Sequence, residues 1–162
     1  MDQVELLTAI IEASVALIGF SGLVIALGRR SSGEWSVIDK TRFTNLLTTG
    51  FISLACALIA LILLSAGLSH AIVWSSSSVV WVVLVMPVVM WTVSRMVRNP
   101  EEATLSWSYT GVSLAVLGAT AAVQVANAAY LAEFWPFFLG LAVVLLIGIT
   151  LFFRLLWFGL FR

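Results

Sequence analysis

Between positions 51 and 93 the chain reads FISLACALIALILLSAGLSHAIVWSSSSVVWVVLVMPVVMWTV, with one histidine and no Asp, Glu, Lys or Arg. A helix needs about 20 apolar residues to cross the roughly 30 Å hydrocarbon core of a bilayer, so this stretch is too long for one crossing. We place the break at Gly67-Leu68-Ser69-His70, where small and polar residues favour a turn. The stretch therefore predicts two membrane-spanning helices joined by a tight hairpin.

Apolar runs on both sides of this stretch extend the pattern to the whole chain. Of the 162 residues, 62% are hydrophobic and only 10% are charged, and the mean hydropathy is +1.13. A soluble domain of this length could not bury so much apolar surface. Because a backbone in lipid must satisfy its own hydrogen bonds, each span is predicted to be helical. We predict an all-α, polytopic membrane protein: one transmembrane domain covering residues 1–162, a bundle of five helices with spans at about 6–27, 43–68, 72–93, 105–131 and 137–153.

The basic residues predict the orientation of this bundle. All eight Lys and Arg residues fall between spans one and two, between spans three and four, or at the end of span five: Arg29, Arg30, Lys40, Arg42, Arg95, Arg98, Arg154 and Arg162. Cytoplasmic segments collect Lys and Arg, so we expect the N-terminus outside and the C-terminus inside. We expect the prokaryotic inner (cytoplasmic) membrane as the location. Arg154 is interpreted as an anchor whose side chain snorkels to the inner interface.

Three spans carry a stripe of polar and small residues along one helical face. The stripe of span one contains Glu5, Thr8, Glu12, Ala16 and Gly19; that of span two contains Asn45, Thr48, Thr49, Ser53, Cys56 and Ala60; that of span four contains Ser106, Tyr109, Thr110, Ser113, Thr120, Gln124 and Asn127. Spans three and five have no comparable stripe, and their middles are Val, Leu, Ile, Phe and Trp around the whole circumference. We therefore predict that spans one, two and four form the interior, and that spans three and five face lipid.

Glu12 is the most informative polar residue because it lies inside the predicted hydrocarbon, about 10 Å along span one. A charged acid at such a depth costs about 3 kcal/mol, so it should be protonated, paired or facing water. Our hypothesis is an ion or proton pathway at Glu12, with Glu5 at its entrance and with Gln124 and Asn127 beside it. The alternative is a neutral carboxyl that bonds to those two amides and holds helices together.

Small residues on spans one and four predict close contacts between helices. Small side chains let two helices approach closely in a membrane, where this packing replaces the hydrophobic effect as a source of association. We assign this helix-packing role to Gly19, Gly22, Gly118 and Ala122.

The residue inventory argues against catalysis. One His and one Cys, well separated along the chain, cannot supply a metal cluster, and no phosphate-binding glycine loop occurs. No basic patch is large enough for nucleic acid. We expect no enzyme activity, no cofactor and no metal. The expected partners are membrane lipid and further copies of the chain.

Two hypotheses for function remain open. The first is a homo-oligomeric channel or pathway for ions or protons, in which copies of the chain bring their acids together as a ring. The second is an accessory or structural subunit that docks on another membrane protein. Water access to Glu12 would favour the first hypothesis, and burial of Glu12 in amide contacts would favour the second.

Overall fold

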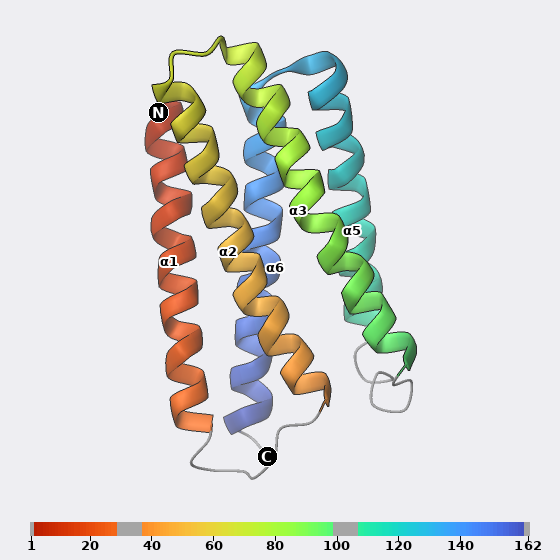
Figure 1. The fold of residues 1–162 in the computed structure, drawn as a ribbon. Coiled ribbons are helices and arrows are strands. Elements are labelled where there is room, and N and C mark those ends of the chain that lie inside the picture. The colour runs from red at the N-terminus through yellow and green to blue at the C-terminus, as the bar shows by residue number, and fades with distance from the viewer. Residues whose placement is uncertain (1, 29–36, 99–106, 161–162) are drawn as a thin grey trace.

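The computed structural model describes residues 2–28, 37–98 and 107–160, and this part of the chain is helical apart from short turns (Figure 1). Arg29, Arg30 and Arg162 of the predicted basic side, and Ser106 of the predicted span-four stripe, lie outside the described residues. The helices are α1 (Gln3–Gly28), α2 (Val37–Ser65), α3 (His70–Arg98), α5 (Trp107–Ala126), which continues as the π-helical turn η2 (Asn127–Leu131), and α6 (Phe134–Leu160). The predicted all-α fold is confirmed.

Five of these helical segments are long and apolar enough to cross a membrane: Gln3–Gly22, Lys40–Ser65, His70–Arg98, Ser108–Leu131 and Phe134–Trp157. Each approaches or exceeds the length of about 20 residues that a crossing requires. The chain is therefore an integral membrane protein with five transmembrane-length helices. Its orientation stays a prediction from the distribution of basic residues.

The hairpin between α2 and α3 forms at the predicted break. α2 ends at Ser65, and Gly67 adopts a positive φ of 72°, a left-handed conformation that glycine accepts without steric cost. The Gly67 amide donates to the Leu64 carbonyl at 3.0 Å, and the Val73 amide donates to the Ser69 carbonyl at 3.0 Å. These bonds close one helix and open the next, as a glycine-terminated helix end requires. We call the end of the bundle that carries this turn the hairpin end.

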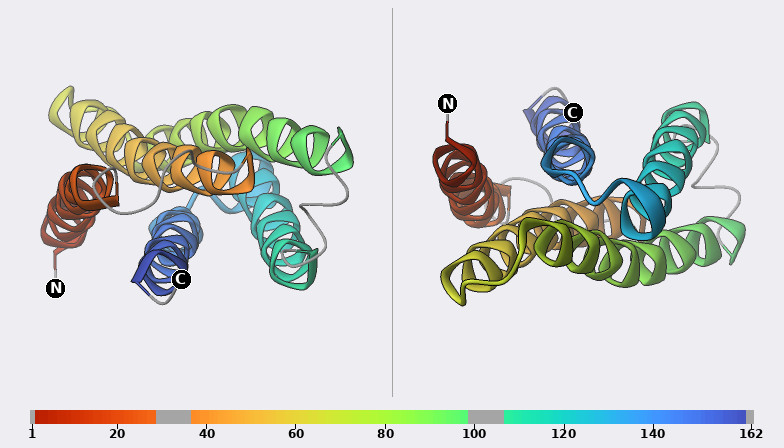
Figure 2. Two further views of the ribbon diagram at one scale, coloured as in Figure 1. Left: turned by 90° about the horizontal axis from the view of Figure 1, so that it is seen from below. Right: turned by 90° about the horizontal axis from the view of Figure 1, so that it is seen from above.

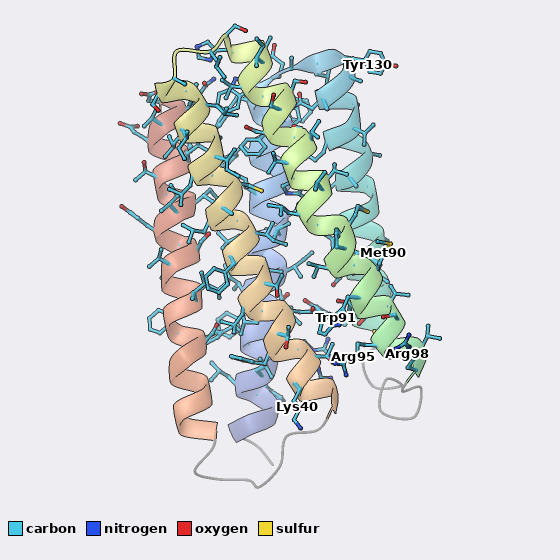
Figure 3. The ribbon with its side chains drawn as sticks, viewed as in Figure 1. Lys40, Met90, Trp91, Arg95, Arg98 and Tyr130 are labelled. Carbon is cyan, nitrogen blue, oxygen red and sulfur yellow. The ribbon has the colours of Figure 1, made fainter. Side chains whose placement is uncertain are left out.

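The opposite end of the bundle carries the basic side chains, and we call it the basic end. Figure 3 shows Lys40 near the start of α2, and Arg95 and Arg98 near the end of α3, at this end of the molecule. Asp2 comes just before α1 and Glu133 just before α6, and both of these helices begin at the hairpin end (Figure 1). The labelled Lys and Arg residues thus share one end of the bundle, as the sequence predicts.

The helices form two layers. Figure 2 shows α2 and α3 in one layer, with α1, α6 and α5 side by side in the other and α6 between its two neighbours. α6 packs against all four other helices, whereas α1 packs against α2 and α6. The buried apolar side chains of α6 include Phe137, Leu141, Val144, Leu145, Leu151 and Leu155.

The expectation that span five lies outside the bundle is therefore wrong, although one face of α6 does remain open to lipid. α6 packs on the other four helices with one face, and its opposite face exposes Leu139, Leu146 and Phe153. A helix that meets helices on one side and lipid on the other can be apolar around its whole circumference.

Glycines allow the central position of α6. A Cβ atom added at Gly140 would lie 2.5 Å from Nε2 of Gln124, and one added at Gly148 would lie 2.6 Å from Oγ1 of Thr49. Neighbouring side chains thus occupy the space that a larger residue on α6 would need.

Candidate functional site

The polar stripes of α2 and α5 face the interior of the bundle, as predicted. On α2, Ser53 and Cys56 are buried. On α5 and η2, Thr120, Gln124 and Asn127 are buried. Most of the remaining stripe residues in the described part of α2 and α5 are half-buried. Two of the three predicted interior faces are therefore interior faces in the fold.

Asn127 joins three segments at the hairpin end. Its Nδ2 donates to Oγ of Ser78 on α3 at 2.8 Å and to the Glu133 carbonyl at 3.0 Å, and its Oδ1 accepts from the Glu133 amide at 2.9 Å. The backbone supports this geometry, because the Ala132 amide donates to the Asn127 carbonyl at 2.9 Å and Ala132 has a positive φ of 52°. Asn127 therefore closes the turn between η2 and α6 and ties that turn to α3.

Gln124, one helical turn before Asn127, also connects α5 to the start of α6. Its Nε2 donates to the carbonyl of Pro136, near the start of α6, at 2.6 Å. Its Oε1 is buried and has no hydrogen-bond partner among the described residues, and the same holds for the side-chain polar atoms of Ser53, Ser77 and Trp81. Such atoms are uncommon, because buried polar groups usually find partners. Nε1 of Trp81 and Nε2 of Gln124 both lie beside Gly140 of α6.

The stripe of α1 faces away from the bundle. Its members Glu5, Thr8, Glu12, Ala16 and Gly19 are all exposed in the single chain. The opposite face of α1 is the buried one, and it contains Leu7, Ile10, Ser14, Leu17 and Ser21. The hydroxyls of the two serines donate to carbonyls of α1 itself, at 2.7 Å and 2.6 Å. The prediction that span one turns its polar stripe inward is wrong.

The orientation of α1 also separates Glu12 from the side-chain amides of Gln124 and Asn127. α1 lies at one edge of its layer and α5 at the other, with α6 between them (Figure 2). Glu12 forms no hydrogen bond or ion pair with any described residue, while Gln124 and Asn127 are engaged with α3 and the start of α6. The expected contact between Glu12 and these amides is not formed within the chain. Glu5 accepts a hydrogen bond from the Asp2 amide at 3.2 Å.

The predicted packing residues are also on outer surfaces. Gly19, Gly22 and Gly118 have open space where a Cβ would be added, and Ala122 is exposed. The close contacts within the chain are made instead at Gly50, Gly140 and Gly148. Any packing role of the four predicted residues is therefore with a molecule outside the single chain.

A partly open cavity of about 100 Å³ lies toward the basic end, between α2, α3, α5 and α6. Arg42 from α2 and Arg154 from α6 both line it, together with Tyr109 of α5. The Arg154 guanidinium lies over the Tyr109 ring, 4.2 Å from its centroid. Arg154 thus points into a space between helices, which its interpretation as an interfacial anchor did not anticipate.

Comparison with families of known proteins, curated proteins and solved structures found no match. Within the described ranges, no three His, Cys, Asp or Glu side chains are grouped so that they could hold a metal ion. Two features of the fold bear on function: the exposed acidic face of α1 and the arginine-lined cavity.

Proposed function

We propose that several copies of this chain assemble around the exposed face of α1 and form a pathway for cations or protons across the membrane. The observation that carries the proposal is the position of Glu12. It is exposed, about 14 Å from the start of α1 and inside the apolar segment Gln3–Gly22. The role is one of transport, and we propose no catalytic step.

The cost of an acid in lipid supports assembly. A single chain would present Glu12 to hydrocarbon, at a cost of about 3 kcal/mol for a charged group at mid-helix. A second copy can cover this face, since Ala16 and Gly19 lie beside Glu12 on it and let another helix approach closely. The buried face of α1 is already occupied by α2 and α6.

Assembly around this face would place like residues of each copy at the same depth. Glu12 would form a ring within the membrane, and Glu5 would form a second ring about two turns closer to the hairpin end. Rings of carboxylates favour cations over anions. Under the predicted orientation, the Glu5 ring faces the outside and is the entrance of the pathway.

Reconstitution tests this function directly. Purified protein in liposomes is expected to carry protons, K⁺ or Na⁺ down an imposed gradient at a rate above that of protein-free liposomes. Replacing the cation by a larger organic cation should abolish the flux, whereas replacing the anion should leave it unchanged. A folded oligomer that carries none of these ions would contradict the proposal. That outcome would favour the accessory-subunit hypothesis, in which another membrane protein covers the α1 face.

A further inference from the structure

The arginine-lined cavity has an almost entirely apolar surface, although several of the residues around it are polar. Thr92 donates to Oδ1 of Asn45 at 3.1 Å, and Thr49 donates to a backbone carbonyl of its own helix at 2.8 Å. The Tyr109 hydroxyl is hydrogen-bonded to the hydroxyl of Thr150. Because these polar groups are bonded within the protein, a molecule that enters the cavity meets mostly hydrocarbon.

The two arginines of the lining are also engaged with the protein. The Arg154 guanidinium lies over the ring of Tyr109, 4.2 Å from its centroid, in the geometry of a cation–π contact. Arg42 has an interaction of its own within the chain. The cavity therefore selects a ligand by apolar contact and not by charge.

The position of the cavity along the helices decides which apolar molecules can reach it. Every residue that lines the cavity belongs to one of four transmembrane-length segments: Lys40–Ser65, His70–Arg98, Ser108–Leu131 and Phe134–Trp157. The cavity is partly open, and Figure 2 shows the basic ends of α5 and α6 farther apart than their hairpin ends. At this depth the surroundings of the protein are the acyl chains of the bilayer.

The size of the cavity suits part of one acyl chain. Its volume of about 100 Å³ is well below the roughly 300–1,000 Å³ of pockets that hold a whole small molecule. Apolar cavities of about this size stay dry and accept small hydrocarbons. An unfilled apolar space also costs its walls their dispersion contacts, which a hydrocarbon chain restores.

We propose that a segment of an acyl chain from a membrane lipid fills this cavity. Val88 of α3 and Leu114 and Leu117 of α5 line it and contact the chain with branched apolar side chains. The headgroup stays outside the cavity, so binding depends on the chain and not on the charge of the headgroup. No residue of α1 lines the cavity, and the proposal is independent of the ion pathway.

The test labels the cavity from the lipid. The full chain is reconstituted in liposomes with a trace of phosphatidylcholine that carries a photoactivated diazirine in one acyl chain, and labelled residues are mapped by mass spectrometry. Val88 and Leu117 line the cavity and are half-buried, and they should be labelled several-fold more than Val123, which is half-buried but does not line it. The same probe with a phosphatidylglycerol headgroup should give the same pattern.

A larger side chain in the cavity supplies the variant. Ser113→Phe is expected to lower the labelling of Val88 to the level of Val123, because the ring occupies the space of the acyl chain. Leu114→Trp, from the same helix, is the second variant and should have the same effect. Val112→Phe is the matched control, since position 112 is 65% exposed on α5 and does not line the cavity. It should leave the labelling of Val88 unchanged.

Three results would overturn the proposal. The first is labelling of Val88 and Leu117 that is no stronger than that of Val123, or that both cavity-filling variants leave unchanged. The second is labelling of Val88 by a water-soluble carbene reagent in place of the lipid probe, because the cavity would then hold water. The third is labelling that occurs with the phosphatidylglycerol probe alone, because the headgroup would then decide binding.

Discussion

Replacing Glu12 by glutamine is expected to reduce cation or proton flux through the reconstituted protein to the level of protein-free liposomes. Glutamine has nearly the same shape but can neither carry a negative charge nor exchange a proton. It should therefore remove the ring of charge from the pathway. The measurement is the initial rate of ion or proton movement into liposomes, normalised to the amount of inserted protein.

Glu133→Gln is the matched control for this substitution. Glu133 is exposed in the turn before α6, so its replacement removes one negative charge without touching α1. The fold of Glu12→Gln should be at least as stable as that of the natural chain, because neutralising an acid removes its insertion cost of up to about 3 kcal/mol. Unchanged flux in Glu12→Gln, beside unchanged flux in the control, would exclude Glu12 from the pathway.

Replacing Asn127 by leucine is expected to lower the free energy of unfolding by about 2–4 kcal/mol. The change removes three hydrogen bonds, and each such bond in a membrane protein contributes about 0.6–2 kcal/mol. It also leaves the backbone groups of Glu133 and the buried hydroxyl of Ser78 without this partner, and unsatisfied polar groups are costly. Unfolding by a denaturing detergent in mixed micelles measures the difference.

Tyr130→Leu is the control for Asn127→Leu. Tyr130 lies in the same π-helical turn, but its side chain is 88% exposed and points away from the bundle (Figure 3). Its replacement should change the free energy of unfolding by less than about 1 kcal/mol. Equal effects of the two substitutions would show that the turn as a whole is sensitive and that the bonds of Asn127 have no special role.

The number of helices and the α2–α3 hairpin could be predicted from sequence because they depend on length, hydropathy and turn residues. Which face of α1 and of α6 packs against other helices could not be predicted in this way. Lipid tails are as apolar as leucine, so a pattern of hydropathy shows that two faces of a helix differ without showing which one meets lipid. Glu12 and Asn127 both looked like interior residues, yet Asn127 has partners in its own chain and Glu12 has none among the described residues.

The arginine-lined cavity was missed for a related reason. Arg154 lies near the end of an apolar run, and an arginine in that position usually snorkels to the interface. Tyr109 was the available signal in the sequence. It belongs to the polar stripe of span four, which was predicted to face the interior, and it lies at the same end of the bundle as Arg154. Only the packing of α5 against α6 shows that the tyrosine ring and the guanidinium are in contact.

The central claim is that the exposed face of α1 is covered by other copies of the chain. Ala16→Cys tests it, because Ala16 is exposed on that face and the natural Cys56 is buried. Membranes containing this variant are treated with a short bis-maleimide, beside membranes containing Val112→Cys, whose side chain position is 65% exposed on α5. The account predicts cross-linked dimers and larger oligomers of Ala16→Cys in clear excess over the α5 control. Ala16→Cys that stays monomeric, or that cross-links only to a different protein, would contradict the account.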